Sequence, residues 1–211
     1  MKKLTKKQKL EMEKNSSHLL ALLFNNASEE EIIEYINNTA LINIDVRDKN
    51  LNTPLRLAVN RRYNELSKLL IEKGADINIK NIHNNGILST LIIDSSTELV
   101  NFVLDKGINI YDLDERSKYG GFFRCLFDSK DIEIVKMIVN KVEKADEITL
   151  IIEECDSHRT NFHCKRHISS YIEMREEFYT EVKQYLDKKL LSIKLHEELI
   201  INSVKKETKK I

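Results

Sequence analysis

The stretch from Asn52 to Asn81 reads NTPLRLAVNRRYNELSKLLIEKGADINIKN. Its Thr53 is suited to cap a helix, and Pro54 to the first helical turn, where no N–H donor is needed. Apolar residues three and four apart then form one stripe of a second helix: Leu66, Leu69 and Leu70. Gly74 supplies the left-handed residue that ends a helix. The stretch therefore predicts a helix pair, and a pair this small buries its apolar stripe only if neighbours stack on it.

The rest of the chain repeats this pattern. A shift of 33 residues carries Leu66 onto Leu99 and Gly74 onto Gly107. A further shift of 35 gives a looser third copy, in which Val142 takes the place of the glycine. Upstream, SSHLLALLFNN and SEEEIIEYINN have the same two-helix shape without the signature residues. We interpret the sequence as a short array of helical repeats.

The best copy resembles the ankyrin-repeat family. Residues 53–58 (TPLRLA) are similar to the family's TPLHxA pattern, residues 69–78 carry its Leu-Leu and Gly-Ala-Asp-x-Asn ending, and 33 is the family's period. Arg56 departs from the family's His, which links finger and helix by hydrogen bonds. The resemblance implies an all-α fold: a short ankyrin-repeat solenoid of about three to four helix-turn-helix repeats with β-hairpin fingers, plus a helical C-terminal extension.

The expected organisation has three parts. They are a basic N-terminal segment (1–15), an ankyrin-repeat array (16–143) and a helical C-terminal capping or interaction region (144–211). Within the array we expect a degenerate first unit (16–41), two repeats (42–74 and 75–107) and a degenerate repeat (108–143). Apolar residues in the last region, from Tyr171 to Ile201, recur three and four apart, which predicts one-sided amphipathic helices. These helices either cover the apolar flank of the terminal repeat or bind a partner.

Charge and hydropathy argue against nucleic acid and membranes as partners. Lys+Arg and Asp+Glu are equal at 34 each, so the whole chain has no bias toward nucleic acid or membrane surfaces. The two ends are basic but lack interleaved aromatic residues, which makes them a weak nucleic-acid signal. The longest apolar run, LLALLF at 19–24, is too short to span a bilayer, and no secretory leader is seen. We expect a cytoplasmic protein, including one delivered into the cytoplasm of a host cell.

Catalytic motifs are absent, but one cluster leaves an alternative open. No phosphate-binding glycine loop occurs, and the HEE at 196–198 lacks the second His of a zinc protease because Ile200 stands there. We therefore expect no enzyme and no cofactor. Residues 155–167 (CDSHRTNFHCKRH) gather side chains that zinc prefers: Cys155, His158, His163, Cys164 and His167. Two interpretations follow, a polar helix junction with a free thiol, or a metalloprotein or small metal-dependent enzyme.

The resemblance implies a protein–protein interaction module: an adaptor, a scaffold, or a secreted effector or inhibitor. The family's variable contact positions, on the fingers and the concave helix face, fall here on Lys49, Asn50, Asn52, Asn60, Arg61, Ile82, His83, Asn85, Ile93 and Asp94. In the third copy they fall on Lys118, Asp128 and Ser129. Ile82 and Ile93 are the most informative, since apolar residues at such positions have no core to enter. We expect a monomer that binds another protein, with self-association through the C-terminal helices as the alternative.

Overall fold

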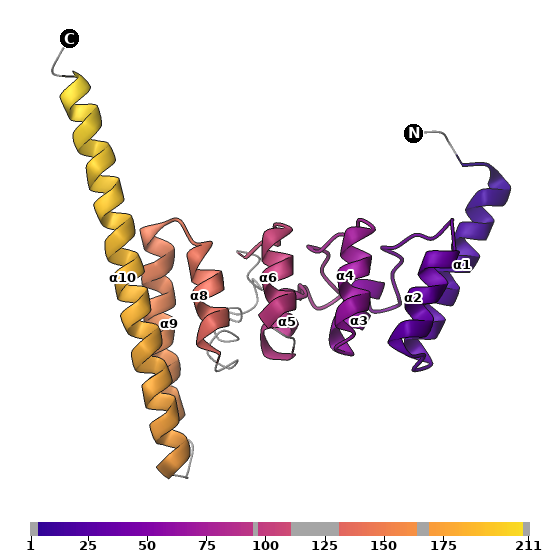
Figure 1. Cartoon of the computed structure of the whole chain (residues 1–211), viewed down its shortest axis with the longest axis horizontal. Coiled ribbons are helices and arrows are strands. Elements are labelled where there is room, and N and C mark those ends of the chain that lie inside the picture. The colour runs from indigo at the N-terminus through magenta and orange to yellow at the C-terminus, as the bar shows by residue number, and fades with distance from the viewer. Residues whose placement is uncertain (1–3, 95–96, 111–130, 164–168, 209–211) are drawn as a thin grey trace. The chain divides into compact units, whose positions relative to one another are not determined.

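The computed structural model describes residues 4–94, 97–110, 131–163 and 169–208, and the chain divides into two compact units, Met1–Asp112 and Leu113–Ile211. The first unit holds α1 (Lys6–Phe24), α2 (Glu29–Asn38), α3 (Pro54–Asn60), α4 (Asn64–Glu72), α5 (Leu88–Asp94) and α6 (Thr97–Asp105) (Figure 1). The second holds α8 (Ile132–Asn140), α9 (Ala145–His163) and α10 (Ser169–Thr208). All regular secondary structure among the described residues is helical, with no strand, so the β-hairpin form of the fingers is not confirmed.

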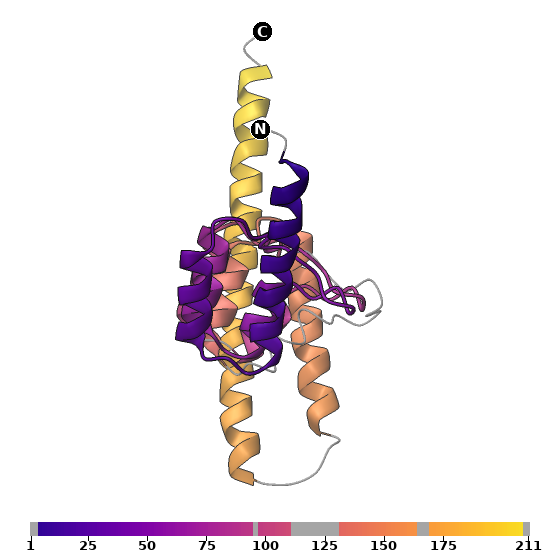
Figure 2. The same ribbon diagram turned by 90° about the vertical axis from the view of Figure 1, so that its right-hand side faces the viewer.

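The helices of the first unit stack as pairs. Within the pairs α1 packs on α2, α3 on α4 and α5 on α6; between pairs, α1, α3 and α5 follow one another, as do α2, α4 and α6. The loops that join α2 to α3 and α4 to α5 project to the same side (Figure 2). Each pair contributes apolar side chains with no exposed surface: Leu19 and Ile32, then Leu55 and Leu66, then Leu91 and Leu99. Burial of one such side chain contributes about 1.5–3 kcal/mol, so the stacked pairs stabilise one another.

The predicted helix boundaries of the best copy are confirmed. The Thr53 side chain accepts a hydrogen bond from Arg56 N at 3.3 Å, and Pro54 occupies the first turn of α3. Gly74 follows α4 with φ of +93°, and Gly107 follows α6 with φ of +83°. Both conformations are open to glycine without a Cβ clash, so each glycine ends its helix where the sequence predicted.

The basic N-terminal segment is helical from residue 6 onward. Helix α1 begins at Lys6, after a capping box in which Thr5 and Gln8 each bond the other's backbone, and it runs through residue 15 without interruption. Further along α1, Asn15 Nδ2 donates to Leu41 O at 3.0 Å. Residues 6–15 therefore belong to the first helix pair, because their backbone hydrogen bonds continue those of the packed part of α1.

In the second unit α10 packs on α9 and α8. The contact buries Ile148, Ile151 and Cys155 from α9, and Tyr179, Val182 and Leu186 from α10. Lys183 Nζ donates to both carboxylate oxygens of Asp156, at 2.8 and 2.6 Å, and this bond raises the pKa of Lys183. Polar contacts thus fix the register of α10 along α9.

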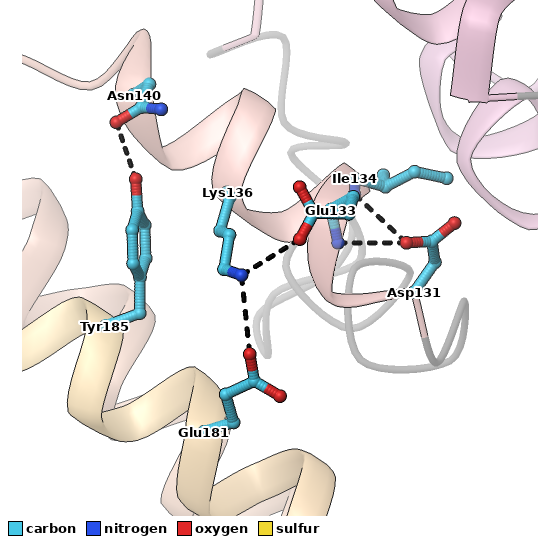
Figure 3. A network of polar contacts seen from close by, with 7 residues as sticks. All are labelled: Asp131, Glu133, Ile134, Lys136, Asn140, Glu181 and Tyr185. Atoms are coloured by element: carbon cyan, nitrogen blue, oxygen red, sulfur yellow. Dashed lines mark hydrogen bonds and ion pairs between the residues drawn. The ribbon is translucent and has the colours of Figure 1, made fainter.

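Helix α8 is tied to α10 by a polar network (Figure 3). Lys136 Nζ lies 2.9 Å from Glu133 Oε1 and 3.3 Å from Glu181 Oε1, and Tyr185 Oη donates to Asn140 Oδ1 at 2.6 Å. We had placed the residues of α8 in the array, with a boundary at residue 143. The structure groups α8 with α9 and α10 in the second compact unit, and the repeat boundary at residue 143 stays a prediction.

Candidate functional site

Two loops of the first unit form matching finger tips, the first at residues 48–52 and the second at residues 81–85. In the first tip, Asp48 Oδ1 accepts hydrogen bonds from the backbone N–H groups two and four residues later, both at 2.8 Å. In the second, Asn81 Oδ1 accepts from the equivalent groups at 3.0 and 3.1 Å. The fourth residue of each tip takes a left-handed φ, of 59° and 61°. The hydrogen bonds therefore repeat with the period of 33 seen in the sequence.

Consecutive fingers are joined to each other. Asp45 Oδ1 accepts a hydrogen bond from Asp76 N at 3.1 Å. One period of 33 residues later, Asn78 Oδ1 accepts the equivalent bond from Asn109 N at 2.8 Å. At the tips, Ile82 N donates to Asn50 O at 2.9 Å. These bonds fix the spacing between the two finger tips.

Arg56 links α3 to the second finger. Its side chain is 7% exposed, and Nη1 donates to Asn85 O, 29 residues away, at 2.8 Å. Burial lowers the pKa of Arg56, yet an arginine stays charged at neutral pH. The residue that departs from the family pattern therefore makes a charged hydrogen bond to the following repeat.

Four predicted contact residues lie exposed on the tips: Lys49, Asn50, Ile82 and His83. Ile82 is 52% exposed although its backbone is held by Asn50. An apolar side chain held in water on an ordered tip is suited to contact another molecule.

Two more predicted residues lie where α3 ends. Asn60 is exposed, while Arg61 is half-buried with its guanidinium 5.9 Å from the centre of the Tyr63 ring. Tyr63 Oη in turn donates to Ala27 O at 3.0 Å. The position of Arg61 is therefore set by a ring that is itself anchored to the preceding helix pair.

The remaining predicted residues are used internally or not described. Asn52 is half-buried and its Nδ2 donates to Asp48 Oδ2 at 2.9 Å, and Asn85 provides the carbonyl that Arg56 binds. The backbones of Ile93 and Asp94 end α5, but their side chains lie outside the described part, as do three residues of the third copy: Lys118, Asp128 and Ser129.

One exposed apolar residue of the finger tips was not predicted from the sequence. Leu51, at the left-handed position of the first tip, is 40% exposed. The hydrogen bond of Ile82 to Asn50 brings Leu51 close to the second tip. A single leucine inside the polar run DKNLN, between two helices, was the signal that could have found it.

The Cys/His cluster is only partly described. Cys155 is buried on α9; the backbones of His158 and His163 belong to the same helix, but their side chains are not described. Cys164 and His167 lie outside the described residues. Among the residues that the structure does describe, no group of three His, Cys, Asp or Glu side chains is placed to hold a metal ion. The metal-site interpretation stays a prediction.

Within the described ranges, no helix combines the length and the apolar character needed to cross a membrane.

Stacked helix pairs with finger loops on one side, repeated every 33 residues, define a class of helical repeat protein. The family model of the ankyrin repeat matches residues 50–82. The chain thus contains an ankyrin repeat, and the match covers its best-formed repeat. A search of curated proteins gives no match. Ankyrin-repeat domains are generally interaction modules without enzymatic activity, and they typically bind other proteins.

Proposed function

We propose that this protein binds a partner protein through its two finger tips, with the C-terminal end of α3 as a second contact. The observation that supports this is the exposed Ile82, on a tip whose backbone is bonded to Asn50 of the tip before it. Leu51 adds a second exposed apolar side chain. A small apolar centre that is already ordered loses little conformational entropy on binding, which favours affinity.

The groups around this centre specify the chemistry of the partner. Lys49 is cationic, and Asn50 and His83 offer hydrogen-bonding side chains. Interfaces commonly place a polar rim around an apolar core. The complementary partner surface would hold an apolar recess with acidic and carbonyl groups beside it.

We also propose that the helix pairs stack as a short solenoid that presents the fingers and first helices as one concave surface. In this arrangement the protein serves as an adaptor, a scaffold, or an effector or inhibitor that acts on its partner in a cytoplasm. Repeat stacking supports the proposal, because first helices contact first helices and second contact second.

The test compares two equivalent substitutions on the full chain. Ile82→Asp charges the second tip, and Leu10→Asp makes the same change at a residue of α1 that is 68% exposed and far from the tips in the sequence. Proteins captured from lysate by the wild-type chain are identified by mass spectrometry. With the captured partner purified, we expect Ile82→Asp to weaken binding by roughly 30-fold or more, as for a hot-spot residue, and Leu10→Asp to leave it unchanged.

The melting temperatures of both variants should equal that of the wild type, because both side chains are exposed. Equal binding by Ile82→Asp and wild type would refute the role of the finger tips. Equal loss in both variants would point to a general effect of added negative charge.

A further inference from the structure

Helix α10 carries apolar residues on two opposite faces. The face packed on α8 and α9 holds Tyr179, Val182 and Leu186, which are at most 3% exposed. Leu191 and Leu195 are 59% and 51% exposed. At about 100° per residue these two leucines lie about 40° apart and on the far side of the helix from Val182 and Leu186.

This second face corrects the sequence analysis, which placed the apolar residues of the tail on one side. Leu199, which lies in the stretch that was expected to form one apolar side, is 68% exposed. The helix has 40 residues and runs past the ends of α8 and α9 (Figure 1). Among the described helices of the second unit, α8 and α9 therefore leave this face uncovered along the last turns of α10.

The exposed face continues as a regular seam, with steps of four and three residues. Its members are all exposed: Gln184, Lys188, Leu191, Leu195, Glu198 and Asn202. Alternating steps of four and three are the spacing of the contact positions in a coiled coil. We call these six residues the α10 seam.

We propose that the α10 seam pairs with the α10 seam of a second copy of this chain, antiparallel, with the two-fold axis at the level of Ile193. In this register each residue lies as far before Ile193 as its partner lies after it. Leu191 meets Leu195 of the second copy (two positions either side), Lys188 meets Glu198 (five), and Gln184 meets Asn202 (nine). Every layer of the seam then pairs like with like or a cation with an anion.

The charges decide the direction of pairing. A parallel arrangement would set Lys188 against Lys188 and Glu198 against Glu198, whereas the antiparallel one forms two Lys–Glu pairs that enclose two leucine layers. Such flanking pairs contribute more to orientation and partner choice than to affinity. Lys194 lies beside the axis and approaches its own copy, the one unfavourable charge contact in this register.

The seam is short, so the association should be weak and reversible. Two leucine layers with an ion pair on each side bury less surface than a standard stable interface of about 800 Å² per partner. The proposal uses no finger-tip residue. It can therefore fail without affecting the proposed function, and the reverse also holds.

Sedimentation equilibrium of the full chain tests the pairing. The monomer mass is 24.7 kDa, and we expect the average mass to rise toward twice this value as the concentration increases through the micromolar range. Lys188→Glu and Glu198→Lys should each weaken the dimer at least about tenfold, because each replaces two attractive contacts by two repulsive ones. The double variant should recover to within about threefold of wild type, since the pairs are restored in reverse.

Mixing the two single variants gives a second readout. One chain then carries Glu at both positions and the other carries Lys at both, so both pairs form only in the mixed dimer. Lys194→Ala should tighten the wild-type dimer severalfold by removing the like-charge approach.

Glu197→Lys is the matched control, since it makes the same charge change one residue away and off the seam, at an exposed position. It should leave the dimer unchanged, and circular dichroism should show equal helix content in all variants. A chain that stays monomeric overturns the proposal. So does a double variant that fails to recover, a single variant without effect, or a control as disruptive as Glu198→Lys.

Discussion

Replacing the buried Arg56 by methionine tests whether its hydrogen bond holds the second finger. Methionine keeps an apolar stem of similar length but removes the charge and the donor to Asn85 O, which lies 2.8 Å from Nη1. A hydrogen bond from a charged group contributes about 1.5–3 kcal/mol net. Part of this is offset, because the guanidinium is 7% exposed and its desolvation, which lowers its pKa, is relieved. We expect the free energy of unfolding to fall by about 1–2 kcal/mol.

Urea unfolding followed by circular dichroism measures this change. The midpoint should move to lower urea with the slope unchanged, and the melting temperature should fall by about 2–8 °C for a chain of this size. Hydrogen exchange should be faster at residues 81–85, whose tip loses its anchor to α3. Arg47→Met removes an exposed arginine and should change stability by less than about 0.5 kcal/mol. If Arg56→Met is as stable as wild type or more so, the cost of burying the charge exceeds the value of the bond, and the reasoning is wrong.

Three further predictions concern single sites in the first unit. Gly74→Ala should cost about 1–2 kcal/mol in urea unfolding through backbone strain alone, because φ is +93° and an added Cβ meets no atom within 4 Å; an unchanged midpoint would contradict this. The hydrogen bond from Lys68 lowers the pKa of Glu98 from 4.5, so its stabilisation is present above that pH and lost as pH falls through the lowered value. Glu98→Gln should therefore be less stable than wild type at neutral pH and equal to it in acid, whereas a difference independent of pH would argue against the pair. Glu29 Oε1 accepts from a backbone N–H in the first turn of α4 at 2.8 Å, so Glu29→Ala should cost about 1 kcal/mol in the same assay and the exposed Glu34→Ala almost nothing; equal losses would refute a capping role.

The parts of the fold that could be predicted were those set by local signals. Thr53, Pro54 and Gly74 act on their own backbone or on neighbours within one turn, so their types alone predict where α3 begins and α4 ends. Periodicity then showed that the pattern recurs. Both kinds of signal need no knowledge of which distant residues meet.

The contacts that could not be predicted join residues far apart in the chain. The bond of Arg56 to Asn85 spans 29 residues and depends on how α3 packs beneath the next loop. The two faces of α10 were missed because periodicity locates apolar stripes but not the helix that covers each one. Contact with α8 and α9 accounts for the burial of Leu186, whereas Leu191 is exposed on a stripe that neither of these two helices covers.

In each finger tip, the side chain of the first residue accepts hydrogen bonds from the backbone of the same loop and so holds the loop in its turn. This residue is Asp48 in the first tip and Asn81 in the second. The closing side chain bonds to the backbone N–H groups two and four residues later, so the side chains at the two following positions take no part in this closure. Lys49, Asn50 and their equivalents can therefore be exchanged without loss of the loop's conformation. If partners bind at the tips as proposed, binding specificity is separable from folding, and new partners could be selected from a library randomised at four positions while the 33-residue framework stays fixed.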